Sequence, residues 1–500
     1  MIHGWPFGGP SGARLRAFTL SLVVLVWCAL VRPAAGVTFL EVMGAPHTRH
    51  PYLARVMPVG PASAYFNPGM LIEDPNTVLI GPFVHYERLR VRLDPRPPEA
   101  DVPRVFLQAL DAPGGEALTA HSTTLPTADL PRPRRGQDVS RAVFCVGQGT
   151  STQVIPGRLA VGLYLLLVGD AFHPQEARFA DEREQAFSNR LGYELYGERL
   201  SAVAFAFGLA GRPLEWLTLG AGISLGFASE VRAAGYYPNE ESPEDLQLRT
   251  TSSLNIRLQP QFSVSVAPLE GLGVSVTLHL PYANVTRGRG DFLIRASDGG
   301  AEGSRAHDME LAARHGDLPW RVGLGAAYVR APGSGFGFGV GAQAVIAQWS
   351  KYRDRAGERP RGWSETVTLA AGGELLWRAH AWAVNLQWVP SPVPAQTGRT
   401  NYVDSPRLGF SLGWESRFQV GPIQLLAGVN LSAQALLPVS TTKSPEAAYP
   451  VRDELPDTAV GLDGAPLPEA VGLQTNNPGY PGYSSSGWLL GFGATLRVLF

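Results

Sequence analysis

Two short motifs have the residue types and the spacing of a serine nucleophile. Gly222–Gly226 and Gly409–Gly413 both read G-x-S-x-G, with Ser224 and Ser411 at their centres. In hydrolases this motif places the serine on a sharp turn from a strand into a helix. Here both matches lie inside stretches where apolar residues alternate with small ones, which predicts strand on both sides of the serine. We therefore expect no catalytic residue, and no enzyme.

The sequence offers few ligands for a metal ion. His47 and His50 lie in the stretch His-Thr-Arg-His, which lacks the spacing of a zinc-binding helix. His279 alternates with apolar residues, so we expect it to face an interior. The two cysteines, Cys28 and Cys145, exclude a disulfide framework and a multi-cysteine zinc or iron–sulfur site. No metal and no cofactor are expected.

The composition favours a protein rich in turns and strands. Of 500 residues, 57 are glycine and 42 proline, and the formal net charge is −1. So many turn residues are unusual for helical bundles and coiled coils. A charge so close to neutral, without a basic block, gives no electrostatic footprint for nucleic acid. We therefore expect no nucleic-acid partner.

Residues 1–36 have the parts of a secretory signal peptide. Arg14 and Arg16 precede an apolar run from Ala17 to Val31, and small residues follow at 34–36. The run is shorter than the ~20 residues of a membrane-spanning helix, and no later apolar segment reaches that length. We expect the signal to be cleaved. The mature chain is then either a secreted β protein or a membrane β-barrel.

The last segment decides between these two classes. From Trp488 to Phe500 one face is entirely apolar and the other is mostly small or polar, and the chain stops on an aromatic residue. The apolar face is Trp488, Leu490, Phe492, Ala494, Leu496, Val498 and Phe500. The other is Leu489, Gly491, Gly493, Thr495, Arg497 and Leu499. Outer-membrane barrels need this alternation, because successive side chains point to lipid and to the lumen.

The same alternation recurs along the chain and predicts an all-β fold, a transmembrane antiparallel up-and-down β-barrel of about 14 strands. The expected strands are 77–93, 140–147, 158–169, 199–211, 216–230, 251–267, 272–283, 319–331, 336–350, 363–378, 380–390, 406–418, 421–437 and 486–500. Short turns alternate with long polar connections, as periplasmic turns and outer loops do in such barrels. We assign Asp291–Ala313 to a loop, with an extra hairpin as the alternative. Tryptophans near strand ends suit interfacial girdles, namely Trp216, Trp320, Trp363, Trp382, Trp388 and Trp488.

Residues 37–76, before the first strand, do not alternate. They contain the stretch Ala-Ser-Ala-Tyr-Phe-Asn67-Pro68-Gly69-Met-Leu. This stretch resembles the hatch of the FadL family of outer-membrane transporters for long-chain fatty acids and hydrocarbons, also called the TodX family, whose plug carries an Asn-Pro-Ala motif. Gly69 departs from that motif at its third position. The segments Arg199–Leu225 and Pro390–Asp404 resemble a strand pair and a late outer loop of the same family.

The resemblance implies three regions: a signal peptide (1–36), an N-terminal plug or hatch (37–76) and a transmembrane barrel with long extracellular loops (77–500). It implies a bacterial outer-membrane protein that admits fatty acids or other hydrophobic molecules by diffusion. Asn67, Pro68 and Gly69 are the expected hatch residues, since proline fixes φ and an asparagine amide can pin a turn. The expected partners are a hydrophobic small molecule, outer-membrane lipid and, through Phe500, the barrel-assembly machinery. The ligand-binding residues are unknown, and Arg497 is expected to point inward with a structural role.

Three alternatives stay open at this point. A general porin for polar solutes would have a charged, hydrated constriction and no plug. An outer-membrane enzyme acting on lipids would need a histidine and an acid or amide beside a serine such as Ser224. A structural or adhesive envelope protein would use the long loops.

Overall fold

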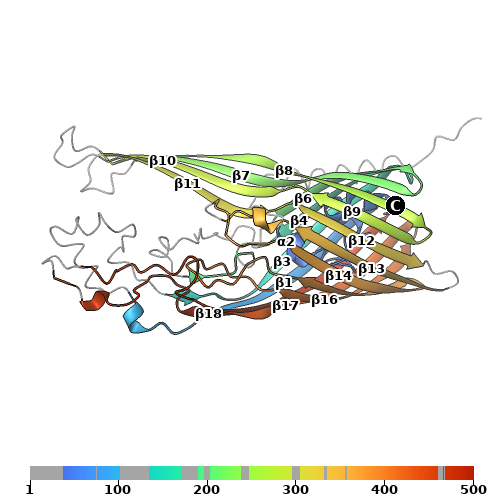
Figure 1. The fold of residues 1–500 in the computed structure, drawn as a ribbon. Coiled ribbons are helices and arrows are strands. Elements are labelled where there is room, and N and C mark those ends of the chain that lie inside the picture. The colour runs from blue at the N-terminus through green and yellow to red at the C-terminus, as the bar shows by residue number, and fades with distance from the viewer. Residues whose placement is uncertain are drawn as a thin grey trace, which may run out of the picture.

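The computed structural model describes residues 38–74, 76–101, 134–169, 190–195, 203–237, 247–294, 305–330, 335–354, 357–459, 465–466 and 468–500. The expected signal segment lies outside these ranges. Fourteen antiparallel strands close into a barrel (Figure 1), which confirms the predicted class and strand number. In order around the wall they are β7 (Leu217–Tyr237), β6 (Val203–Leu214), β4 (Leu159–Val168), β3 (Asp138–Ile155), β1 (Thr77–Leu93), β18 (Gly482–Leu499), β17 (Ile423–Thr442), β16 (Arg407–Val420), β15 (His380–Val389), β14 (Thr366–Trp377), β13 (Phe336–Ala347), β12 (Arg321–Arg330), β9 (Leu272–His279) and β8 (Gln247–Leu269), which pairs again with β7.

The alternation in the sequence sets the two surfaces of the wall. In β18, Trp488, Phe492 and Leu496 are each about half exposed on the outside. Leu489 and Leu499, from the other face, are buried inside. A strand places successive side chains on opposite faces, so one apolar belt runs around the outer surface. The predicted faces of this strand are therefore confirmed.

The turns segregate to the two ends of the barrel as expected. Among the described residues, the short ones, at 156–158, 215–216, 270–271, 378–379 and 421–422, lie at the end where β1 begins and the chain stops. The long connections lie at the other end, where the described residues include β2 (Arg135–Gly136), β5 (Arg190–Leu191) and the short helices η3 (Pro98–Ala100), η8 (Trp349–Lys351) and η9 (Pro468–Ala470).

Four of the six tryptophans predicted for the girdles are exposed at the outer surface: Trp216, Trp382, Trp388 and Trp488. Trp320 is only partly exposed. Trp363 is buried, so its assignment was wrong. Trp363 follows the long connection from η8 and stacks on Tyr352, with ring centroids 4.4 Å apart, which holds it among the loops.

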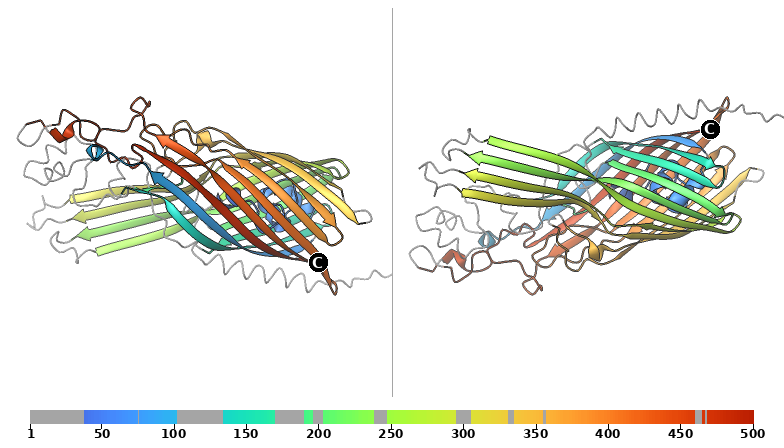
Figure 2. Two further views of the ribbon diagram at one scale, coloured as in Figure 1. Left: turned by 90° about the horizontal axis from the view of Figure 1, so that it is seen from below. Right: turned by 90° about the horizontal axis from the view of Figure 1, so that it is seen from above.

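The assignment of 291–313 to a loop was also wrong. β10 (Tyr282–Ile294) and β11 (Arg305–Leu318) form a hairpin, the alternative left open by the sequence. β10 pairs in parallel with residues 229–237 of β7, past the residues of β7 that pair with β6. β11, β10, β7 and β8 therefore make a four-stranded extension of the wall. Figures 1 and 2 show this extension projecting well past the rim. Pro281 and Pro319 mark the two bends where the hairpin leaves β9 and β12.

The segment before β1 lies inside the barrel (Figure 2). It consists of α2 (Thr38–Met43), η1 (Gly60–Ala62), α3 (Ser63–Phe66) and η2 (Pro68–Ile72), joined by turns. Nearly all of its side chains are buried, and its apolar residues belong to the main core together with inward residues of the wall. Among the described residues, no helix has the length and apolar composition that a membrane span requires.

Candidate functional site

The candidate site is the contact between the internal segment, residues 38–74, and the inner face of the wall. Asn67 lies between α3 and η2 and is fully buried. Its side-chain amide donates to the main-chain oxygen of Arg55, 2.7 Å away. Pro68 opens η2, a position where its missing N–H costs nothing. The two residues thus fix a bend that presses Gly69 against the wall.

Gly69 packs directly against the barrel wall. Its N–H donates to Oγ of Ser263 in β8 at 2.9 Å. A Cβ at Gly69 would lie 3.1 Å from that oxygen, so even alanine would have to displace it slightly. On the neighbouring strand β7, a Cβ at Gly220 would lie 2.2 Å from the Gly69 nitrogen. Only glycine at position 220 therefore permits this packing.

A first charged cluster joins the segment to β14, β16 and β18. The guanidinium of Arg49 pairs with Glu374 at 2.9 Å and with Glu415 at 2.5 Å. Glu415 also pairs with Arg497, which points inward as predicted. Both carboxylates are nearly buried, so each depends on these cations for its charge to be tolerated in the interior.

His50 adds to the same cluster. Its Nε2 lies 3.0 Å from Oε2 of Glu374, and its Nδ1 lies 3.1 Å from Oδ1 of Asn385. The Asn385 amide nitrogen donates to the main-chain oxygen of Arg49 and to Ser411 Oγ. Ser411, the centre of the second G-x-S-x-G match, therefore helps to hold the segment in place.

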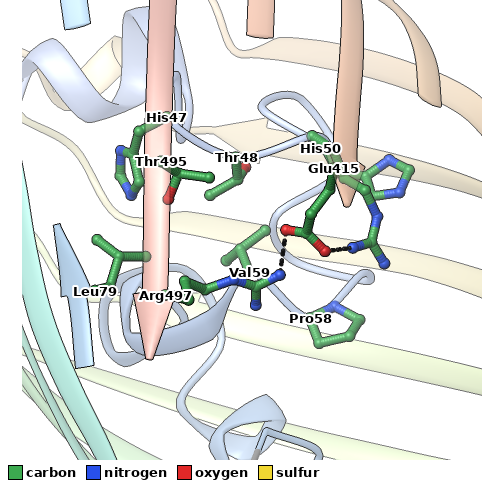
Figure 3. Close-up of a pocket in the computed structure, with 10 residues that line it drawn as sticks. His47, Thr48, His50, Pro58, Val59, Leu79, Glu415, Thr495 and Arg497 are labelled. Carbon is green, nitrogen blue, oxygen red and sulfur yellow. Dashed lines mark hydrogen bonds and ion pairs between the residues drawn. The ribbon is translucent and has the colours of Figure 1, made fainter. Parts of the chain in front are cut away.

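A small cavity lies beside this cluster (Figure 3). Residues 47–50, Pro58 and Val59 line one side, and Leu79, Glu415, Thr495 and Arg497 of the wall line the other. Its empty volume is about 260 Å³, part of which is open to solvent. The space in it that a water molecule could occupy is only about 10 Å³, about enough for a single water. The cavity is thus a narrow seam between segment and wall.

A second charged cluster joins α2 to β12. Glu41 pairs with Arg55 and with Arg321, each at 3.0 Å, and accepts a hydrogen bond from the Tyr65 hydroxyl at 2.7 Å. Burial by itself raises the pKa of Glu41, but the two guanidinium groups outweigh it and lower the pKa to about 2. His279 is buried and packs edge-on against Tyr65, so its predicted inward direction is confirmed.

The remaining polar residues singled out in the sequence do not form a chemical centre. His47 stacks on Tyr164 with centroids 5.5 Å apart, and burial lowers its pKa to about 3. Among the described residues, no group of His, Cys, Asp or Glu is suited to a metal ion. Ser224 is buried, and within the described ranges its Oγ has no hydrogen-bond partner. Cys145 is buried, and its thiol lies 3.9 Å from the main-chain oxygen of Val143.

Above the internal segment, one continuous apolar cluster reaches the long-loop end. It begins at α2 with Phe39, continues along β1 and β18, and ends at Tyr352, Trp363 and Tyr402 among the loops. Trp363 meets Tyr402 edge-on, with centroids 5.6 Å apart. Apolar side chains, aromatic and aliphatic, thus connect the long-loop end to the internal segment.

The charged residues of the site were not identified from the sequence, apart from the direction of Arg497. A signal existed at two positions, because Glu374 and Glu415 occupy inward positions of strands whose outward faces are apolar. A charge in such a position needs a partner. Their partner Arg49 lies 325 and 366 positions away in the sequence. Glu41 and Arg55 of the second cluster lie in a segment without periodicity. Only the folded chain therefore identifies these pairs.

Comparison with solved structures identifies the architecture. A FadL homologue from Pseudomonas aeruginosa superposes with a TM-score of 0.52 at 15% sequence identity, covering 91% of this chain and 97% of that one. The Pseudomonas putida toluene transporter TodX gives 0.46 at 9% identity, covering 94% and 99%. The CymD monoaromatic hydrocarbon channel gives 0.45 at 9% identity, covering 92% and 97%.

No protein-family model matches the sequence, and no curated protein matches it. The likeness to the FadL homologue covers nearly the whole of both chains. At 15% identity it establishes the fold, a plugged barrel.

Proposed function

We propose, from the FadL fold of this chain, that it is an outer-membrane transporter that admits hydrophobic small molecules. The observation that carries this proposal is the closed barrel with an apolar outer belt, an internal plug, and an apolar cluster that runs from the plug to the long-loop end. A belt of this kind fits the hydrocarbon core of a bilayer. Removing hydrocarbon from water supplies about 0.8 kcal/mol per CH₂, which is enough to draw such molecules inward.

The proposal requires the plug to move. Residues 38–74 fill the lumen, and the cavity beside Arg49 is too small for a fatty acid or an aromatic hydrocarbon. We infer that the hatch opens by separating the two charged clusters from the wall, with Asn67, Pro68 and Gly69 as its bend. A general porin would instead need a hydrated constriction, and the buried plug argues against it.

Among hydrophobic molecules, we favour those with a carboxylate head group, such as long-chain fatty acids. Arg55 and Arg321 share the single carboxylate of Glu41. This leaves one positive charge in excess at a buried site inside the barrel, where an incoming carboxylate would gain more than in water. Neutral hydrocarbons such as toluene are the second candidate, supported by the aromatic residues of the loop end.

The proposed location is the bacterial outer membrane. The signal segment, residues 1–36, would direct export to the periplasm and then be cleaved. The terminal Phe500 would present strand β18 to the barrel-assembly machinery. The long connections would then face the outside and the short turns the periplasm. Outer-membrane lipid is the solvent of the belt.

The experiment that tests the function is uptake in a strain that lacks such a transporter. Expression of the chain should raise uptake of a labelled long-chain fatty acid several-fold and leave uptake of a sugar unchanged. Arg321→Gln should lower fatty-acid uptake more than toluene uptake. Equal gains for sugar and fatty acid would contradict the proposal in favour of a porin. A purified mature chain that stays monodisperse without detergent would contradict the membrane location itself.

A further inference from the structure

An outward-facing aromatic cluster lies at the short-turn end of β14, β15 and β16. Trp377 and Trp382 stack with centroids 6.4 Å apart, and His380 packs against Trp382 at 5.6 Å and against Trp414 at 6.0 Å. Trp377 and Trp382 keep nearly half of their surface exposed. Three indoles and an imidazole therefore lie next to one another on three adjacent strands.

Arg378 completes the cluster. It is an exposed residue in the turn between β14 and β15, and its guanidinium lies 4.8 Å from the centre of the Trp377 ring. Its φ of 53° is the one left-handed backbone among the described residues other than glycine. Such a φ is rarely adopted by long side chains, and glycine or asparagine would fit it better. The arginine is thus held at the turn in spite of backbone strain.

The cluster carries positive charge without an acid beside it. Within the described part of the chain, Arg378 has no ion pair, and the carboxylates of Glu374 and Glu415 on these strands point inward to Arg49. A guanidinium that is already stacked on an indole keeps N–H groups free for oxygen acceptors at its edge.

The position of the cluster specifies the partner. Directly beyond it, Leu375, Val384 and Leu412 are about half exposed and belong to the apolar belt. The cluster therefore lies where a belt of hydrocarbon contact ends and a polar layer begins, which is the level of lipid head groups. A ligand that contacts both regions has acyl chains for the belt and an acidic head group for Arg378.

We propose that Arg378 and the cluster formed by Trp377, His380, Trp382 and Trp414 bind the phosphate head group of an anionic phospholipid of the periplasmic leaflet. The phosphate accepts hydrogen bonds from the Arg378 guanidinium, the indole edges border the glycerol region, and the acyl chains lie along Leu375 and Val384. This proposal rests on the proposed membrane location and goes beyond the transport function. It does not depend on which molecule is transported.

Native mass spectrometry of the purified mature chain, released from micelles with added phosphatidylglycerol or phosphatidylcholine, tests the proposal. The wild-type chain should retain phosphatidylglycerol about fivefold more than phosphatidylcholine, as one cation at the lipid surface provides. Arg378→Asn, which removes the charge and suits the left-handed φ, should abolish that preference. Arg158→Gln removes an exposed cation from the β3–β4 turn, which has no tryptophan, and should leave it unchanged.

Brominated phosphatidylglycerol gives a second measurement at the same site, because bromine quenches nearby indoles. Replacing Trp377 by Phe should remove more of the quenching than replacing Trp216, an exposed tryptophan of another turn. Equal binding of the two lipids by the wild-type chain, or an equal loss in the Arg378 and Arg158 variants, would overturn the proposal. Fatty-acid uptake measured in cells that express the same variants separates this result from a failure of the proposed function, since lipid binding is read without any transported molecule.

Discussion

Replacement of Arg49 by Gln is expected to release the plug without unfolding the barrel. Among the described residues, Arg49 pairs with both Glu374 and Glu415; Figure 3 shows Glu415 pointing toward Arg497 beside the cavity. Loss of the Arg49 side chain leaves Glu374 with His50 and Glu415 with Arg497. Breaking a buried ion pair from one side costs about 3–5 kcal/mol. Because the Arg49 side chain is one-fifth exposed, we take the lower figure of about 3 kcal/mol, which raises the open population about 100-fold.

Labelling of a thiol introduced by Val59→Cys measures that population. Val59 lines the seam and is 3% exposed, so a cysteine at this position reacts with a maleimide only when the plug moves. Cys145, the other cysteine of the expected mature chain, is replaced by Ala beforehand. When opening and closing are fast, the labelling rate is proportional to the open fraction. The rate should therefore rise about 100-fold in the Arg49→Gln variant.

Two comparisons make the result decisive. Arg158→Gln, on the β3–β4 turn, removes an exposed arginine with no described ion pair and should leave the rate unchanged. Glu415→Gln combined with Arg49→Gln should add less than the sum of the single effects, because both changes remove the same contact. A rise of less than threefold in an intact barrel, judged by its resistance to denaturation in detergent, would refute the assignment of this cluster as the lock of the plug.

Further outcomes follow from the packing, the charges and the outer belt. Gly220→Ala should loosen the plug by about 1–3 kcal/mol, since its Cβ would meet the Gly69 nitrogen, whereas Gly273→Ala, with open space around its Cβ, should not change the labelling rate of the Val59→Cys thiol. The ion pairs of Glu41 stabilise the plug fully above its unfolded pKa of about 4.5, and that stability of about 3 kcal/mol is lost as the pH falls through its folded value of about 2. Pepsin cleavage of the plug should therefore increase between pH 4 and 2, and the Glu41→Gln variant should lose this pH dependence. Phe492→Arg on the outer belt should destabilise the inserted barrel by about 2–4 kcal/mol in a lipid-bilayer unfolding titration, while Thr495→Arg on the inner face should disturb the plug rather than insertion.

The two charged clusters also explain why the plug is specific to one position in the lumen. Apolar contacts alone tolerate sliding, because any methyl group can replace another. Glu41 with Arg321 of β12 and Arg49 with Glu374 of β14 fix two points of the segment to different strands. A plug held at two polar points can be released at one of them and still stay attached at the other.

The wall of the barrel was predictable from the amino-acid pattern alone. Strand side chains alternate with a period of two, so the apolar face of residues such as Trp488 and Phe492 was readable wherever one side meets an apolar environment. Connection lengths then separated the two ends and gave the strand number. Trp363 and the β10–β11 hairpin were misassigned because long connections carry no such periodicity. In addition, β10 pairs with residues 229–237 of β7, which lie far from it in the sequence.

The candidate site, by contrast, depends on contacts that form only in the folded chain. The pairing of Arg49 with Glu374 joins residues 325 positions apart, and no local pattern relates them. Asn67, Pro68 and Gly69 were visible as a turn, yet the reason for a small residue at 69 is the neighbouring glycine of β7 and the hydroxyl of Ser263. Buried charges must find partners wherever the closed barrel brings them, and that choice depends on the shear and register of the whole wall rather than on neighbours in sequence.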